Sequence, residues 1–311
     1  MCREKYQHLL TVHVSMTQGH SMSRQTATLV GLIAIITWAF LALLGTAAGA
    51  VPPLQLTAMT FFIGAVAGMA TWPFRPGALA ALRQPWPVWI VGTMGLCVYH
   101  ITYFYAIQNA PPVEASLIAY LWPLLIVLFA ALLPGERLRL QHLAGAILGL
   151  CGAALIITKG GAIGLSEGLK SGHILALGCA FIWSSYSVIS RRFGDVPSDI
   201  TSAFCLITAL VAAILHFAFE QTVMPASLLQ WVAIVALGAI PLGLAFYTWD
   251  VGVKKGDIMV LGAASYSAPL LSTLVLLVGG YAAFHWTIAL ACLLITAGAV
   301  VAAKDMIFKK G

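Results

Sequence analysis

Ten apolar stretches follow one another along the chain, and short polar turns separate them. A membrane-spanning helix needs about 20 mostly apolar residues, and each stretch is close to that length. The predicted spans are residues 28–48, 53–72, 87–108, 113–133, 141–158, 171–190, 199–218, 228–249, 258–278 and 283–303. The pattern predicts an all-α polytopic membrane protein of ten transmembrane helices, whose loops are too short to hold an aqueous domain.

The second half of the chain repeats the first. Trp38 recurs as Trp183 at an offset of 145 residues, and Tyr120-Leu-Trp-Pro-Leu-Leu recurs as Tyr266-Ser-Ala-Pro-Leu-Leu at an offset of 146. Each half holds five spans, so this odd number requires the second half to lie inverted relative to the first. Inverted repeats are typical of secondary transporters, in which the substrate site lies near the membrane midplane between the repeats.

The repeat sets the expected domain organisation. Residues 28–159 form the first five-helix repeat, residues 171–303 form the second, and residues 160–170 link them. Residues 1–27 are expected to be a disordered N-terminal tail, and residues 304–311 a C-terminal tail. Met22 stands shortly before the first span and is an alternative start of the native protein.

Composition and charge agree with a membrane protein and add its orientation. Hydrophobic residues make up 61% of the chain and charged residues 8%, whereas soluble domains carry about 25% charged residues. Fourteen of the 16 lysines and arginines fall in the termini and loops of one side, and only Lys159 and Lys170 fall on the other. Positive loops stay in the cytoplasm, so both termini are expected to be cytoplasmic. The net charge of +6 therefore reports topology, and no nucleic-acid partner is expected.

The predicted spans show no pattern of a metal or cofactor site, and the three histidines of residues 1–26 leave a metal-binding tail only as the alternative to a disordered extension. Five of the six cysteines lie inside predicted spans without the spacing of metal ligands, and they are interpreted as small packing residues. Intramembrane enzymes need paired acids, a histidine with an acidic partner, or a metal cluster at membrane depth. The absence of such groups argues against an enzyme. A scaffold remains an alternative to a transporter.

Ionisable groups are nearly absent from the middle of the spans. Charge at membrane depth is costly and is kept for function, yet Asp, Glu, Lys and Arg occur only at span ends and in loops. The titratable residue nearest a span centre is His100, beside Tyr99 and Tyr103. Tyr99 and Tyr103 are four residues apart and share one helix face. His100 is either a substrate-binding group or a histidine satisfied by a neighbouring helix.

Aromatic residues also lie deeper than usual. Trp and Tyr normally collect at the membrane interfaces, but Trp38, Trp122, Trp183, Tyr120 and Tyr266 lie close to span centres. A buried indole or phenol needs a hydrogen-bond partner, and water or a polar substrate in a cavity can supply one. A central cavity is therefore favoured over helix packing. Tyr120 and Trp122 lie about 200° apart on a helix, so one of them can face elsewhere.

Three prolines interrupt predicted spans. Pro123, Pro241 and Pro269 each remove a backbone donor and free a carbonyl one turn earlier. Such breaks are tolerated where neighbouring helices or a water-filled cavity satisfy the freed groups. Pro123 and Pro269 are repeat mates, each three residues after a tyrosine. We interpret the three prolines as kinks with a gating role, with a purely structural kink as the alternative.

These absences narrow the substrate class. An organic-cation antiporter needs an embedded carboxylate, and a carrier of phosphorylated substrates needs buried Lys or Arg. The spans offer neither, so the substrate is expected to carry no large net charge. Deep tyrosine, tryptophan and histidine side chains suit a zwitterion with a flat apolar part, such as an aromatic amino acid.

The motifs at the end of the first half resemble a known repeat. Pro123-Leu-Leu, then Leu133-Pro-Gly-Glu136, then Gly145-Ala, are similar to the end of the EamA repeat of the drug/metabolite transporter superfamily. The second half departs from this pattern, because Ala282 stands where Glu136 stands in the first. The resemblance covers residues 28–303 and implies two inverted five-helix repeats around a central cavity.

Within that superfamily, the aromatic motifs are most similar to the YddG-type aromatic amino acid exporters. The resemblance implies export of aromatic or other neutral amino acids from a bacterial cytoplasm through the inner membrane. The protein is expected to function as a monomer. Export of other neutral metabolites or drugs is the alternative. Transport is expected to be facilitated, with a proton step at His100 as the other possibility. The residues expected to bind substrate are Tyr99, His100, Tyr103, Tyr120, Trp122, Trp183 and Tyr266.

Overall fold

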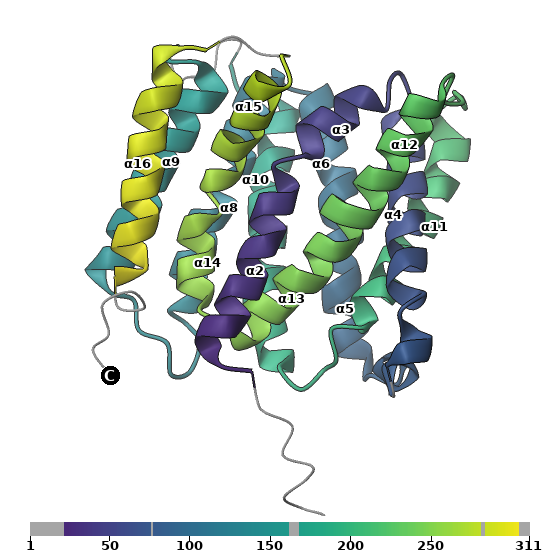
Figure 1. Cartoon of the computed structure of the whole chain (residues 1–311), viewed down its shortest axis with the longest axis horizontal. Helices are drawn as coiled ribbons and strands as arrows, with labels where there is room; N and C mark the ends of the chain where they lie inside the picture. Colours follow the sequence, from purple (N-terminus) through teal and green to yellow (C-terminus); the bar gives the residue numbers. More distant parts are fainter. Residues whose placement is uncertain (1–21, 76, 162–167, 281–283, 305–311) are drawn as a thin grey trace, which may run out of the picture.

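The computed structural model describes residues 22–75, 77–161, 168–280 and 284–304, and all elements in these ranges are helical. The helices cross one slab in ten passes (Figure 1). Eight of these passes are long and apolar enough to span a membrane, and the two shorter apolar helices Glu114–Ala130 and Trp286–Ala302 complete the set. The prediction of a ten-helix polytopic membrane protein is therefore confirmed.

The ten passes are built from seventeen pieces of helix. In chain order they are α2 (Arg24–Trp38) with α3 (Leu41–Ala47), α4 (Pro53–Met69), α5 (Trp86–Thr93) with η3 (Met94–Val98) and α6 (Tyr99–Gln108), α7 (Pro112–Ala119) with α8 (Trp122–Ala130), α9 (Leu140–Thr158), α10 (Ser171–Ser190), α11 (Ile200–Phe219), α12 (Leu228–Leu237) with η5 (Gly238–Leu244) and α13 (Ala245–Lys255), α14 (Ile258–Ala264) with α15 (Ser267–Val278), and α16 (Trp286–Ala302). Short helices η1 (Trp72–Phe74), η2 (Ala78–Leu82) and η4 (Arg191–Phe193) lie in the turns.

The first helix starts earlier than predicted. α2 begins at Arg24, so the expected tail of residues 1–27 is too long by its last few residues. The cause is Ser23, whose side chain accepts a hydrogen bond from the backbone N–H of Thr26 and caps the helix. Residues 1–21, 162–167 and 305–311 lie outside the described residues, so the expected tail disorder and most of the linker lie there too.

The two repeats run in opposite directions through the slab. Arg24 at the start of α2 and Arg191 just after the end of α10 both bond to the carboxylate of Glu136. The first helix of the first repeat, α2, therefore starts at the face where the first helix of the second repeat, α10, ends. The odd number of spans in each repeat predicts this inversion, and the structure confirms it.

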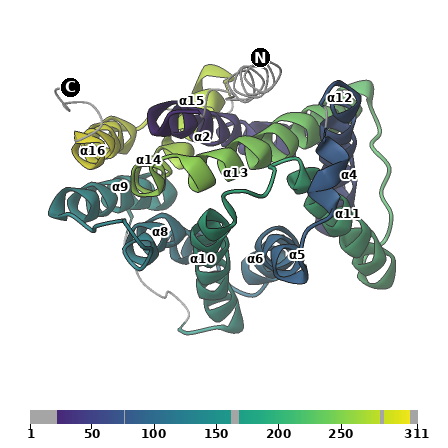
Figure 2. The same cartoon turned by 90° about the horizontal axis from the view of Figure 1, so that it is seen from below.

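Helices of the first repeat pack against helices of the second across the molecule. α9 packs on α16 at one edge, α4 packs on α11 at the other, and α2 with α13 and α10 with α6 lie between them (Figures 1 and 2). Glycine allows the closest of these approaches. A Cβ added at Gly298 would lie 2.6 Å from the carbonyl oxygen of Gly145. Gly145 and Gly149 thus let α9 pack closely against α16.

Broken helices gather in the middle of the molecule. Pass one breaks between Trp38 and Leu41, pass four at Tyr120, and pass nine at Tyr266. Passes three and eight each contain a π-helical segment, η3 and η5, at repeat-related positions. The three sequence-predicted prolines lie at such irregularities: Pro123 and Pro269 follow the breaks, and Pro241 lies inside η5. Irregular backbone at membrane depth and π-segments are both frequent at functional sites.

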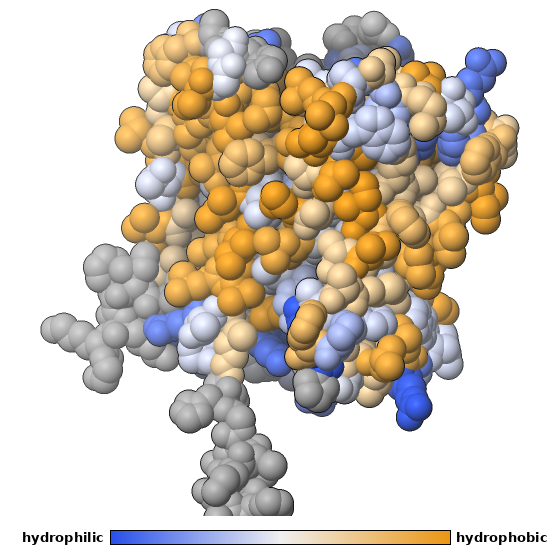
Figure 3. Space-filling model, turned by 45° about the vertical axis from the view of Figure 1, so that its right-hand side comes forward, coloured by the Kyte–Doolittle hydropathy of each residue, from blue (hydrophilic) through white to orange (hydrophobic). Residues whose placement is uncertain are grey.

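The outer surface matches a membrane environment. Figure 3 shows an apolar belt at mid-height with hydrophilic side chains gathered towards both ends of the molecule. Large apolar side chains of α11 and α12 are exposed, among them Leu210, Ile214, Val232 and Val235. An exposed apolar surface of this extent is stable in lipid and not in water. The chain is a multi-pass membrane protein.

Candidate functional site

Four tryptophans from four helices meet in the core of the molecule. The ring centre of Trp38 lies 6.3 Å from that of Trp122, 5.9 Å from that of Trp183 and 5.2 Å from that of Trp249. Trp122 and Trp183 are also in contact, at 6.2 Å. The three deep tryptophans of the sequence prediction therefore lie together, and Trp249 joins them. We refer to these four residues as the tryptophan cluster.

Hydrogen bonds fix two of these rings in place. The indole N–H of Trp38 donates to the carbonyl of Pro241 at 3.1 Å, inside the π-helical segment η5. The indole N–H of Trp249 donates to the Ser187 hydroxyl at 3.1 Å. A buried indole N–H needs such a partner. The first bond also joins the broken helix of one repeat to the irregular helix of the other.

A second group of rings extends from the cluster along α6. Tyr99 lies 5.2 Å from Trp183, and Tyr103 stacks on Tyr99 at 6.2 Å with an interplanar angle of 8°. The shared helix face expected for these two tyrosines is thus confirmed. His100 lies on the neighbouring side, 4.8 Å from Phe61 and 5.7 Å from Phe246. Tyr99, His100 and Tyr103 are only partly buried.

The backbone fixes the tautomer of His100. Its Nδ1 lies 2.7 Å from the carbonyl oxygen of Leu96, in the π-helical segment η3. A carbonyl only accepts hydrogen bonds, so Nδ1 carries the proton and donates. In a neutral ring Nε2 is then left as an acceptor. The side chain can therefore accept a hydrogen bond from an ammonium or hydroxyl group without itself carrying charge.

The structure separates Tyr120 from Trp122, as their angular offset predicts. Trp122 faces the tryptophan cluster, whereas Tyr120 packs with Tyr266 and Val127 in a neighbouring apolar group. The Tyr266 ring is fully buried against α9, where a Cβ at Gly149 would lie 2.6 Å from it. Tyr120 and Tyr266 therefore lie beside the cluster and outside it.

The Tyr266 hydroxyl has a structural partner. It accepts a hydrogen bond from the backbone N–H of Leu124 at 3.1 Å. Leu124 follows the helix break at Tyr120 and needs an acceptor other than a helical carbonyl. The phenol of one broken helix thus satisfies the break of its repeat mate.

Three aromatic residues of the site escaped the sequence analysis. Trp249 and Phe246 lie near the predicted end of the eighth span and resemble interface residues, and Phe61 lies mid-span but has no polar atom to draw attention. The internal repeat indicated two of them, Trp249 and Phe246, through their repeat mates. An offset of 146 residues takes Tyr103 to Trp249 and His100 to Phe246.

One carboxylate is also more buried than the sequence predicted. Asp250 was expected at a span end, outside the membrane interior, but it follows Trp249 directly and is 2% exposed. Its Oδ2 lies 2.7 Å from Nζ of Lys254, one turn along α13. This internal ion pair neutralises the carboxylate, so the aromatic site gains no net charge from it.

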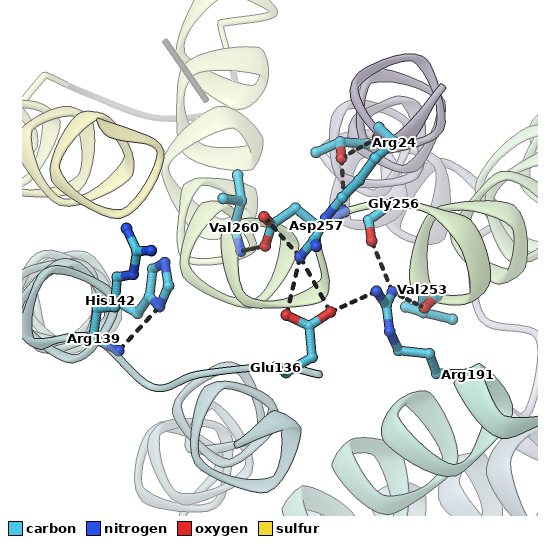
Figure 4. A network of polar contacts seen from close by, with 10 residues as sticks. Arg24, Glu136, Arg139, His142, Arg191, Val253, Gly256, Asp257 and Val260 are labelled. Atoms are coloured by element: carbon cyan, nitrogen blue, oxygen red, sulfur yellow. Dashed lines mark hydrogen bonds and ion pairs between the residues drawn. The ribbon is translucent and has the colours of Figure 1, made fainter. Parts of the chain in front are cut away.

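Charged side chains close the face that carries the start of α2. Glu136 accepts from Arg24 at 3.0 and 3.1 Å and from Arg191 at 2.6 Å (Figure 4). Arg24 also reaches Asp257 at 3.0 Å. Arg191 donates in addition to the carbonyls of Val253 and Gly256, at 3.0 and 2.7 Å. We refer to Arg24, Glu136, Arg191 and Asp257 as the charge network.

The network joins the two repeats. Glu136 belongs to the first repeat, and Arg24 begins the first helix of that repeat, whereas Arg191 and Asp257 belong to the second. The backbone N–H of Asp257 also donates to the Thr28 hydroxyl at 2.8 Å, which fastens α14 to α2. Opening this face requires these contacts to part.

The opposite face uses a smaller ion pair. Nε2 of His173, at the start of α10, lies 2.9 Å from Oε2 of Glu114 at the start of α7. Passes one and nine meet through Arg24 and Asp257. The repeat-related passes six and four meet through His173 and Glu114. The two faces are thus held at equivalent places by different chemistry.

Two inverted repeats, with broken helices around a shared aromatic cluster and an ionic closure of one face, define a membrane transporter. Residues 25–158 and 170–303 each match the EamA-like transporter family, and the chain belongs to it. It is therefore a transporter and not an enzyme.

Known relatives agree along the length of the chain. An aromatic amino acid exporter, YddG, of Ancylobacter novellus is 52% identical over 282 residues, which is 90% of this chain and 98% of that protein. YddG of Salmonella typhimurium is 28% identical over 265 residues, 81% of this chain and 88% of that protein. A solved crystal structure with 51% identity superposes with a TM-score of 0.85 and covers 91% of this chain and 99% of its own.

Proposed function

We propose that this protein exports aromatic amino acids across the bacterial inner membrane by alternating access. The observation that carries the proposal is the tryptophan cluster, which lies where the broken helices of both repeats meet. The 52% identity to an aromatic amino acid exporter over nearly its full length supports the same substrate class. The chain works as a monomer, with both termini in the cytoplasm.

The substrate binds between the tryptophan cluster and the ring group on α6. Trp122, Trp183, Tyr99 and Tyr103 contact the aromatic side chain of the substrate through edge-to-face and stacked geometries. His100 Nε2 accepts a hydrogen bond from the substrate ammonium group. Tyr120 and Tyr266 position the broken helices beside the site.

The prolines and the charge network supply the moving parts. Pro123, Pro241 and Pro269 weaken the backbone where passes four, eight and nine bend. The charge network is the cytoplasmic gate, and the Glu114–His173 pair belongs to the periplasmic one. Transport is facilitated, because the aromatic site holds a neutral imidazole and an internally neutralised carboxylate.

A counterflow assay with purified protein in vesicles tests the substrate class. We expect exchange of phenylalanine, tyrosine and tryptophan, and weaker exchange of non-aromatic neutral amino acids. Trp183→Phe should weaken substrate affinity about 2- to 10-fold, the range of an aromatic contact. Trp86→Phe is the matched control, because Trp86 is exposed on the outer surface. Equal exchange of unrelated neutral metabolites or drugs would favour the alternative substrate class.

The orientation has a separate test. A reporter fused after Gly161, which follows the fifth pass (α9), should report the periplasm, because the basic residues concentrate on the opposite, cytoplasmic side. A cytoplasmic signal there would contradict the proposed direction of export without affecting the substrate assay.

A further inference from the structure

A crevice of about 220 Å³ lies between α4, α11 and the eighth pass, away from the tryptophan cluster. Its shape follows from a close crossing. A Cβ added at Gly64 would lie 3.2 Å from Cα of Gly243, so α4 and η5 touch there. Beyond this point α4 and α13 diverge towards the face that carries the charge network (Figure 1). α11 closes the back of the resulting wedge with Thr201 and Ser202.

The wide end of the crevice carries a cation and an anion. Nη1 of Arg75 donates to Oδ1 of Asp199 at 2.7 Å and to the Tyr247 hydroxyl at 3.0 Å. These bonds use one guanidinium nitrogen and one carboxylate oxygen, so Nη2 and Nε of Arg75 and Oδ2 of Asp199 are available to a ligand. Asp199 occupies the N-cap position of α11, yet its side chain does not cap the helix. The carboxylate turns to the crevice instead.

A buried hydroxyl in the same crevice lacks a partner. Thr201 lines the crevice and is 2% exposed, and its Oγ1 has no hydrogen-bond partner in the structure. Buried polar side-chain atoms are nearly always bonded, and an exception needs an explanation. Here the missing partner points to a ligand.

The position of the crevice identifies lipid as the source of this ligand. Leu244, at its edge, is 46% exposed. Its helical neighbour Ile240 is exposed as well. These side chains belong to the apolar outer surface, so the crevice opens towards the acyl chains. Arg75 follows the end of α4, at the depth where lipid headgroups lie.

We propose that this crevice binds a zwitterionic phospholipid with a primary ammonium headgroup, of the phosphatidylethanolamine type. The phosphate accepts from the available N–H groups of Arg75, for which a planar guanidinium is well suited. The ammonium donates to Oδ2 of Asp199 and to the Thr201 hydroxyl. The acyl chains leave past Leu244. Because Arg75 and Asp199 cancel in charge, a zwitterion suits the site better than an anionic lipid does.

Native mass spectrometry of the purified protein tests this site. The protein is offered phosphatidylethanolamine, phosphatidylcholine or phosphatidylglycerol of the same acyl composition, and bound lipid is counted. We expect one phosphatidylethanolamine to be retained preferentially. The quaternary ammonium of phosphatidylcholine cannot donate hydrogen bonds, and phosphatidylglycerol has no ammonium. Equal retention of either competitor, or retention of none of the three lipids, would overturn the proposal.

Two variants place the lipid in the crevice. Arg75→Gln should weaken the binding of all three lipids, because it removes the phosphate contact that they share, and Thr201→Val should weaken binding of phosphatidylethanolamine about 3- to 10-fold through the lost hydrogen bond. Thr208→Val is the matched control, because Thr208 lies on the same helix and its hydroxyl already bonds to the Phe204 carbonyl at 2.9 Å. Thr201→Val removes an unpaired hydroxyl, so it keeps the test valid if Arg75→Gln misfolds. Unchanged lipid binding in Thr201→Val contradicts the proposal.

A free amino acid has the same pair of charged groups, and a competition separates it from the lipid. Phenylalanine at millimolar concentration should leave phosphatidylethanolamine bound, because it has no acyl chain to occupy the apolar part of the crevice. Displacement of the lipid by phenylalanine in wild type, but not in Thr201→Val, would assign the crevice to substrate and sink the lipid assignment.

Discussion

Replacing Glu136 by Gln tests whether the charge network holds one face of the molecule closed. The change keeps the side-chain volume and removes the charge shared by Arg24 and Arg191. Arg24 is half exposed, so its part contributes only about 0.5 kcal/mol. The Arg191–Glu136 contact is largely buried and contributes about 1.5–3 kcal/mol. Arg191 keeps its hydrogen bonds to two backbone carbonyls, so the substitution does not leave a buried charge without a partner.

The total of about 2–3.5 kcal/mol corresponds to about a 30- to 400-fold shift from the closed towards the open form of this face. Hydrogen exchange at the backbone amide of Asp257 measures it, because that amide bonds to Thr28 only while the face is closed. Glu136→Gln should speed exchange by this factor, whereas Asp195→Asn should not, because Asp195 is an exposed carboxylate on the same side. Equal exchange in wild type and Glu136→Gln would refute the gating role.

Three further predictions concern the interior. Gly95→Ala should destabilise the protein by about 1–3 kcal/mol, measured by thermal unfolding, because the new Cβ would overlap the Tyr186 ring. Tyr266→Phe should cost about 1 kcal/mol of stability by leaving the Leu124 N–H unpaired, with substrate affinity in a binding assay unchanged; a large loss of affinity at unchanged stability would place the phenol at the substrate. A proton gradient across vesicles should not drive accumulation by wild type. Strong accumulation that His100→Gln abolishes would make the histidine a proton carrier.

The fold was predictable because a membrane limits the length and the kind of secondary structure that can span it. Span length and the odd number of spans per repeat determine the ten helices and the inversion. The prolines mark three of the five irregular passes, because losing a backbone donor has the same effect in any context, whereas nothing in the sequence marks the irregularities of passes one and three. The meeting of Trp38, Trp122 and Trp183 was also foreseeable, since each is too deep to be an interface residue.

The remaining features depend on contacts between distant parts of the chain. Glu136 bonds to partners 112 and 55 residues away, and nothing local distinguishes it from a solvated loop acid. Asp250 is buried because other helices cover the end of α13. The orientation of Tyr266 is set by α9, where glycine leaves room for its ring. Such features follow from packing between helices, which hydrophobic periodicity does not encode.

The contact between Trp38 and Trp183 has a mechanical consequence. The two rings are repeat mates and touch each other, so they lie at the pseudo-two-fold axis that relates the repeats. When two inverted repeats exchange conformations, points far from the axis travel most and points on it stay in place. The indole pair is thus a pivot, and the charge network lies at the end of a lever arm. A ligand held at the pivot meets the same aromatic surface before and after the exchange, while its route to water changes from one side of the membrane to the other.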